Sequence, residues 1–153
     1  MPEVSHPTDP AGLRVIDVLL VEDDPGDVLM TREAFEASHM PSTLHVVCDG
    51  EQALHFLRGT NDFTGAPRPS LILLDLNLPR RNGLEVLAEV KADRDLLTIP
   101  VVILTTSQAE ADIAASYRLH ANAYITKPPS FDLFTEAIRR VDDFFLSLAQ
   151  LPN

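Results

Sequence analysis

Asp75 is the residue of this sequence whose position most needs a chemical explanation. It comes directly after four large apolar residues, Leu71–Leu74, and Pro79 and Gly83 follow within eight positions. An apolar run of this kind is typical of a buried strand, and a carboxylate at its end is costly unless water, a metal ion or another cation contacts it. The rest of the sequence must therefore supply a partner for Asp75.

The other apolar runs also end in side chains that can bind a charged group. Glu22 and Asp23 lie at the end of the first apolar run of the sequence. Thr105 and Thr106 lie at the end of the fourth run, and Lys127 follows the fifth. In open parallel α/β sheets, binding sites form outside the carboxyl ends of the strands. We therefore expect all of these side chains to lie with Asp75 at one edge of a sheet.

Mg²⁺ is the cation that best explains the acidic residues. Glu22, Asp23 and Asp75 would repel one another strongly in a dry site. A hard cation with oxygen ligands removes this repulsion, and Mg²⁺ prefers few carboxylates, retained waters and a phosphate. The alternative is that the acids are helix caps facing water. That explains Asp24, which precedes Pro25 at the start of a helical pattern, but it does not explain Asp75.

This set of residues is suited to holding and transferring a phosphoryl group. The carboxylate of Asp75 is ionised at neutral pH, so it can attack phosphorus without a general base. Mg²⁺ and Lys127 would neutralise charge on the transferred group, and Thr105 would donate a hydrogen bond to one of its oxygens. Asp75 is therefore the predicted nucleophile.

Five short apolar runs rich in β-branched residues predict the strands of the sheet. They are Val15–Glu22, Leu44–Cys48, Leu71–Asp75, Val101–Thr106 and Ala123–Thr126. Amphipathic patterns with helical spacing separate them, so the sequence predicts a doubly wound α/β fold with a five-stranded parallel sheet and helices on both faces. The polar segment Arg58–Ser70 is expected to be a surface loop.

Three burial expectations accompany this fold. Leu29 is placed on the apolar face of the helix that includes Val28–Ala37, and Tyr117 on the apolar face of the fourth helix. Cys48, the only cysteine, is expected to be a small buried hydrophobic residue. A single cysteine also excludes an intrachain disulfide framework.

Composition narrows the classes of function. The 153 residues, 45% hydrophobic and 23% charged, fit one globular domain. The net charge of −11 argues against nucleic acids and anionic membranes as partners. No apolar run approaches the roughly 20 residues of a membrane helix. Residues 1–14 lack a signal-peptide core and are expected to be a flexible tail before a single domain at 15–153, in a cytoplasmic protein.

The chain resembles the receiver domain of two-component response regulators from Ile16 to Phe145, through the motifs LLVEDD, LILLDLNLPRRNG, PVVILTTS and AYITKP. Asp75 lies 52 residues after Asp23, Thr105 follows after 30 and Lys127 after 22 more. The last two are usual receiver intervals, and the surface loop lengthens the first. The resemblance implies a flavodoxin-like (βα)5 fold with strand order 2-1-3-4-5.

The resemblance also implies a role for each acidic residue. Asp75 would accept a phosphoryl group from a phosphohistidine on a partner sensor histidine kinase. Asp23 would bind Mg²⁺ directly, Glu22 through a water molecule and Asn77 through its backbone carbonyl. The protein would not be an enzyme in the usual sense, because its own chemistry would be limited to slow self-phosphorylation and autodephosphorylation.

Phosphorylation would act on a switch in such a domain. Thr105 and Tyr124 resemble the switch pair, in which the phosphate draws the hydroxyl inward and the aromatic ring follows. Thr106 would supply a second hydroxyl beside the phosphate, and Lys127 would pair with the phosphate. The Lys127–Pro128 bond would be cis. The positions that tune the lifetime of the acyl phosphate would be Asn77 and Ser107.

A narrower resemblance points to single-domain regulators paired with phytochrome-type histidine kinases. It rests on VEDDPGDVLMTREAF, the long surface loop, LDLNLPRRNGLEVL and the absence of an output domain from the sequence. The regulator's output would then be a contact with another protein or onward phosphoryl transfer.

The C-terminal segment predicts a long helix that outruns the sheet. Apolar residues recur by threes and fours from Phe131 to Leu151. The first part of this stripe is expected to pack on the sheet, and the later part to be exposed and to form a homodimer interface. The predicted interface residues are Phe144, Phe145, Leu148 and Leu151.

Three other functions fit parts of the sequence. A receiver-like docking module that is never phosphorylated would share the fold. A haloacid-dehalogenase-type phosphatase needs a second aspartate two positions after the first as its general acid, where this chain has Asn77. An FMN-binding module needs a Ser/Thr/Gly-rich phosphate loop after the first strand, where this chain has Glu-Asp-Asp-Pro-Gly-Asp.

Overall fold

The computed structural model describes residues 15–37 and 41–148, with side chains up to Phe145. The expected tail at 1–14 lies outside the described residues, as do Leu151 and the side chain of Leu148. None of the helices in the described part is both long and apolar enough to cross a membrane.

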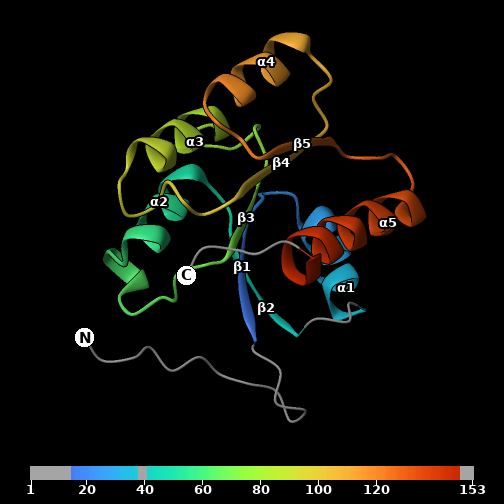
Figure 1. Ribbon diagram of the computed structural model, residues 1–153, viewed down its shortest axis with the longest axis horizontal. Coiled ribbons are helices and arrows are strands. Elements are labelled where there is room, and N and C mark those ends of the chain that lie inside the picture. Colours follow the sequence, from blue (N-terminus) through green and yellow to red (C-terminus); the bar gives the residue numbers. More distant parts are fainter. Residues whose placement is uncertain (1–14, 38–40, 149–153) are drawn as a thin grey trace.

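Five parallel strands form one sheet in the order β2-β1-β3-β4-β5, which confirms the predicted flavodoxin-like α/β fold (Figure 1). The strands are β1 (Ile16–Val21), β2 (Ser42–Val47), β3 (Leu71–Leu74), β4 (Val101–Thr105) and β5 (Ala123–Thr126). The order reverses direction beside β1, because β1 pairs with both β2 and β3. In doubly wound sheets this reversal is where ligands bind, beyond the carboxyl ends of the strands.

The helices cover both faces of the sheet. They are α1 (Pro25–Glu36), α2 (Gly50–Arg58), η1 (Asn61–Phe63), α3 (Gly83–Ala92), α4 (Glu110–Arg118), α5 (Phe131–Asp142) and η2 (Asp143–Leu148). Helices α1 and α5 lie side by side on one face, and α2 and α3 lie on the other (Figure 1). The short helix η1 divides the expected surface loop Arg58–Ser70.

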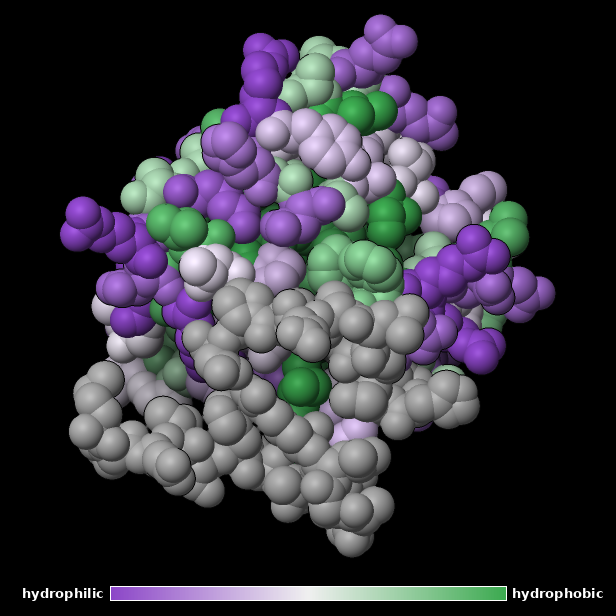
Figure 2. Space-filling model, viewed as in Figure 1, coloured by the Kyte–Doolittle hydropathy of each residue, from purple (hydrophilic) through white to green (hydrophobic). Residues whose placement is uncertain are grey.

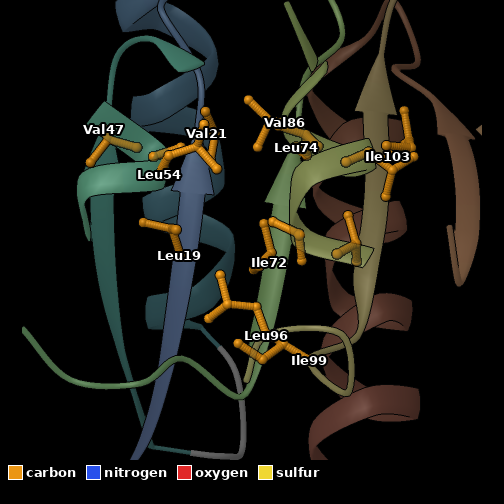
Figure 3. Close-up of a cluster of buried hydrophobic side chains, with 14 of the residues drawn as sticks. Leu19, Val21, Val47, Leu54, Ile72, Leu74, Val86, Leu96, Ile99 and Ile103 are labelled. Atoms are coloured by element: carbon orange, nitrogen blue, oxygen red, sulfur yellow. The ribbon is translucent and has the colours of Figure 1, made fainter. Parts of the chain in front are cut away.

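Alternate strand residues build a separate core on each face, because successive side chains of a strand point in opposite directions. Leu19 of β1 packs with Leu54 of α2 and Val86 of α3 in one core (Figure 3). Leu20, the next residue, packs in the other core with Phe134 of α5. The sheet is therefore apolar on both faces, as the nearly continuous apolar runs predicted.

The three burial expectations were wrong. Leu29 is 57% exposed, Tyr117 is half exposed, and Cys48 is exposed. Cys48 lies after the last residue of β2, where the chain turns outward to begin α2. In α4 the buried residue is Ser116, whose hydroxyl is satisfied by the Asp112 carbonyl within the helix. Its small side chain allows close packing without an unpaired polar group.

The predicted long C-terminal helix is confirmed only in part. Helix α5 ends at Asp142 and continues as a π-helical turn, η2. The wider π-helical turn shifts the phase of the following side chains. Phe134, Ile138 and Val141 are buried and Phe144 is 56% exposed, as expected, whereas Phe131 is half exposed. Phe145, expected to be exposed, is partly buried and packs against the core that contains Phe134.

Candidate functional site

The parallel strands bring the predicted polar residues to one edge of the sheet. Main-chain hydrogen bonds join neighbouring strand ends there, from the Asp75 N–H to the Val21 carbonyl (3.1 Å) and from the Lys127 N–H to the Thr105 carbonyl (2.7 Å). Glu22 follows β1 directly. Residues separated by a hundred positions in sequence therefore meet at one edge of the sheet.

Lys127 lies at the centre of this site and binds three carboxylates. Its Nζ is 2.8 Å from Asp75 Oδ2, 2.5 Å from Glu22 Oε2 and 2.8 Å from Asp27 Oδ2. The Lys127 side chain is only 5% exposed. Sequence reasoning identified Lys127, Asp75 and Glu22 but missed Asp27, which belongs to the first turn of α1 rather than to a strand end.

Asp75 is held in its ionised form. Burial alone would raise its pKa, but hydrogen bonds from Lys127, the Asn77 backbone N–H and the Thr105 hydroxyl outweigh it and lower the pKa below the usual 3.8. The Asn77 N–H donates to Asp75 Oδ1 at 3.0 Å. The same contacts that orient this carboxylate keep it deprotonated.

Glu22 differs from Asp75 in its charge state. Burial raises the pKa of Glu22 from 4.5 to about 7, which hydrogen bonds from Lys127 and from the Asp24 backbone only partly oppose. Burial works against the charged form of Lys127 as well, but its bonds to Asp27, Asp75 and Glu22 raise the Lys127 pKa. Near neutral pH the site thus holds an ammonium among carboxylates, of which Glu22 is the easiest to protonate.

We expect the metal-free protein to lose stability as the pH rises from about 5 to about 7, by about 1–3 kcal/mol. Glu22 keeps its proton in the folded state up to about pH 7 but loses it near 4.5 when unfolded. The folded state therefore binds more protons in this window, and its advantage disappears as the pH rises. Urea unfolding in EDTA measures this slope. Glu22→Gln should flatten it, and an equal slope in that variant would contradict the assignment.

Thr105, Ser107 and Tyr124 form a connected polar chain beside Asp75. Thr105 is fully buried, and its Oγ1 accepts a hydrogen bond from the Ser107 N–H at 3.4 Å. The Tyr124 hydroxyl donates to the Ser107 carbonyl at 2.9 Å. Thr106 is exposed. Thr105 and Tyr124 are therefore connected through the backbone of Ser107.

Two glycines, the first residues of α2 and α3, lie too close to the loop between β3 and α3 to carry a side chain. A Cβ on Gly83 would lie 2.3 Å from the Asp75 carbonyl oxygen, and one on Gly50 would lie 2.2 Å from the Arg81 carbonyl oxygen. Arg80 adopts a positive φ of 66° and lies 3.8 Å from the buried carboxylate of Asp49. The backbone that carries Asp75 is thus fixed against α2 as well as α3.

The residues around Asp75 offer the kind of ligand atom that Mg²⁺ prefers. All of the expected donors are oxygens, and a cation, the Lys127 ammonium, already lies between Glu22 and Asp75. Asp23 is exposed at the rim. No group of three or more His, Cys, Asp or Glu side chains in the described part of the chain is arranged to hold a metal by itself. Mg²⁺ needs fewer protein ligands than that, because it keeps several waters.

The Lys127–Pro128 bond is trans, because no cis peptide bond occurs among the described residues. The cis bond implied by the family resemblance was therefore wrong for this structure. The trans isomer is the lower-energy form of an X–Pro bond, and Lys127 reaches Asp75 without the cis form.

Comparisons with known proteins agree with this geometry. The family model described as the response regulator receiver domain matches residues 18–139. Response regulator Rcp1 of Synechocystis sp. is 43% identical over 135 residues, which cover 88% of this chain and 92% of Rcp1.

Two solved structures are similar over nearly the same range. The crystal structure of the phosphorylated cyanobacterial phytochrome response regulator RcpA matches with a TM-score of 0.88 and 44% identity, over 90% of this chain and 99% of RcpA. The Mn²⁺-bound form of Rcp1 matches with a TM-score of 0.87 and 42% identity, at the same coverages. The chain therefore belongs to the response regulator receiver domains, a family of signalling phosphoacceptors.

Proposed function

We propose that Asp75 accepts a phosphoryl group from a phosphohistidine of a phytochrome-type sensor histidine kinase, in a reaction that requires Mg²⁺. The observation that carries this proposal is the buried, ionised Asp75 carboxylate in contact with the Lys127 ammonium. The phosphorylated relative RcpA and the Mn²⁺-bound relative Rcp1 support the phosphoryl and metal parts. RcpA is a phytochrome response regulator, which supports the choice of kinase.

Each residue has a defined task in the transfer. A carboxylate oxygen of Asp75 forms the new P–O bond as the P–N bond of the donor breaks, and the electron pair of that bond stays on the imidazole nitrogen. The imidazole leaves as a neutral ring because its other nitrogen carries a proton. Lys127 and the Thr105 hydroxyl then donate hydrogen bonds to the phosphoryl oxygens.

The proposed metal ligands are the Asp23 and Asp75 carboxylates and the Asn77 backbone carbonyl, with Glu22 acting through water. When bound, Mg²⁺ supplies charge neutralisation on the phosphoryl oxygens. Thr106 offers a further hydroxyl from the rim. Asn77 and Ser107 flank the acceptor and are the proposed determinants of how fast water removes the phosphate.

Incubation with acetyl phosphate and Mg²⁺, followed by intact-mass spectrometry, tests this function. We expect a single phosphoryl adduct that hydroxylamine removes, because an acyl phosphate is labile to this nucleophile. The adduct should be absent with EDTA and in Asp75→Asn. A full-yield adduct in Asp75→Asn would contradict the assignment. No adduct in the wild type, together with failure to bind beryllofluoride, would favour the unphosphorylated docking module.

We also propose a homodimer formed through η2 and the C-terminal end of α5. A groove of about 390 Å³ lies between β5 and this end, with Ile125, Val141, Phe144 and Phe145 among its lining residues. Figure 2 shows apolar, green surface at the centre of this face, with charged side chains beside it. Exposed apolar surface beside a groove is suited to self-association.

Phe144→Asp is expected to convert the dimer to a monomer, because a buried carboxylate without a partner disrupts an apolar interface. Size-exclusion chromatography with light scattering measures the mass. Leu29→Asp is the matched control, since Leu29 of α1 is 57% exposed and Phe144 is 56% exposed. Persistence of the dimer in Phe144→Asp, or its loss in both variants, would contradict this interface.

A further inference from the structure

Asp27 contacts the site but has no task in the proposed phosphoryl transfer. It lies in the first turn of α1, and its Oδ2 accepts a hydrogen bond from Lys127 Nζ at 2.8 Å. Its backbone carbonyl accepts a hydrogen bond from the Thr31 hydroxyl at 2.7 Å, within the same helix. Asp27 therefore approaches Lys127 from a helix, whereas Glu22 and Asp75 approach from strand ends.

The N–H donors of Lys127 are limited in number, so acceptor groups must compete for them. A lysine ammonium has three N–H donors, and here three carboxylates take them, those of Glu22, Asp27 and Asp75. A phosphoryl group on Asp75 takes over the donor that Asp75 itself holds, because the phosphorylated carboxyl group loses its charge. A second N–H of Lys127 reaches the phosphoryl group only if Glu22 or Asp27 is released.

Asp27 is the partner that can be released at the lowest cost. Its side chain is 18% exposed, whereas those of Glu22 and Asp75 are 3% and 7% exposed. A carboxylate closer to solvent regains water more readily when it loses its cation. Asp27 also lies at the N-terminal end of a helix, where a negative charge is stabilised by the helix dipole.

We propose that Asp27 competes with the phosphoryl group on Asp75 for the Lys127 ammonium, and that it thereby holds the domain in its unphosphorylated state. This inference rests on the proposed phosphoacceptor function and adds a regulatory residue to that site. On phosphorylation, the N–H that Asp75 held and the N–H that Asp27 held both donate to phosphoryl oxygens, while Glu22 continues to hold the ammonium.

Beryllofluoride, a stable mimic of the phosphoryl group, provides the test. Its affinity is measured by isothermal titration calorimetry at saturating Mg²⁺ for the wild type, Asp27→Asn and Asp24→Asn. Asp24→Asn removes the same charge nearby, and asparagine can keep the helix cap that Asp24 forms with the Gly26 N–H. Asp24 therefore reports the general effect of charge on binding an anion.

We expect Asp27→Asn to bind beryllofluoride about tenfold more tightly than the wild type, the effect of removing one competing charge-assisted hydrogen bond. Asp24→Asn should change the affinity less than about twofold, as a screened surface charge does. Asp27→Ser, a second neutral variant, should reproduce the gain, so that the test does not depend on one substitution folding well. The gain should disappear in a Lys127→Met background, because a general charge effect would persist there.

Equal affinities of Asp27→Asn and Asp24→Asn would overturn the competition while leaving the phosphoacceptor function intact. Weaker binding by Asp27→Asn would also overturn it, because Asp27 would then help to position Lys127 for the phosphate. Failure of the wild type to bind beryllofluoride would remove the proposed function itself, and this inference with it.

Discussion

Lys127→Met is expected to destabilise the metal-free protein by about 3–5 kcal/mol near pH 8, as the loss of one partner from a buried ion pair does. The substitution keeps an unbranched side chain but leaves the carboxylates of Glu22, Asp27 and Asp75 without their cation. These groups would then repel one another and take up protons. Urea unfolding of the variant and the wild type measures the difference.

The pH dependence and the metal dependence of this loss distinguish electrostatics from packing. Without Lys127 the pKa values of Glu22 and Asp75 rise, so the folded state binds more protons and the loss should shrink as the pH falls toward about 5. Mg²⁺ should restore more stability to Lys127→Met than to the wild type, since the metal supplies the missing positive charge. A loss that does not change with pH or Mg²⁺ would indicate a packing defect instead.

The fold could be predicted because the strands carry their own pattern. All four residues of β3 are buried, since both faces of the sheet are covered, and a continuous apolar run is the sequence signal of such a strand. Asp24 caps α1 with Pro25 at its first position, as the sequence indicated. Strand order followed from the family resemblance rather than from these patterns.

The meeting of Glu22, Asp75, Thr105 and Lys127 was predictable for a topological reason. Parallel strands bring their carboxyl ends to one edge, so residues that follow different strands become neighbours. This reasoning did not identify Asp27, because Asp27 lies within α1, where the helix dipole already explains an acid in the first turn. The usable signal was its position, because the first turn of a helix that directly follows a strand lies over the same edge.

The spacing of apolar residues did not predict which side chains of the outer helices are buried. Isolated apolar residues do not by themselves identify the side of a helix that faces the protein. Leu29 lies on the side of α1 away from the buried Thr31, Ala34 and Phe35. In α4 the buried position is Ser116, and its neighbour Tyr117 is half exposed. Likewise, the regular spacing after Phe131 did not indicate the change to π-helical geometry at Asp143.

Gly83→Ala is expected to have a large effect for the addition of a single methyl group. Its Cβ would lie 2.3 Å from the Asp75 carbonyl oxygen and 2.6 Å from the Leu76 Cα, and both are backbone atoms that cannot move aside as a side chain can. The loop that carries Asp75 and Asn77 would have to shift. We expect a loss of about 2–3 kcal/mol in the free energy of unfolding, the cost of overpacking a tight core.

The same shift should slow the phosphorylation of Asp75 by about tenfold or more, because a displacement of about 1 Å is enough to misalign an attacking group. Gly26→Ala is the matched control, since its Cβ would meet only Asp24 Oδ1, at 3.4 Å. Adduct formation from acetyl phosphate is followed by intact mass at a temperature where both variants are folded. If Gly83→Ala reacts as fast as Gly26→Ala, the close contact with Gly83 contributes to folding but does not position the acceptor. If only Gly83→Ala is slow, the glycine is required because it lets α3 approach the backbone of the phosphoacceptor.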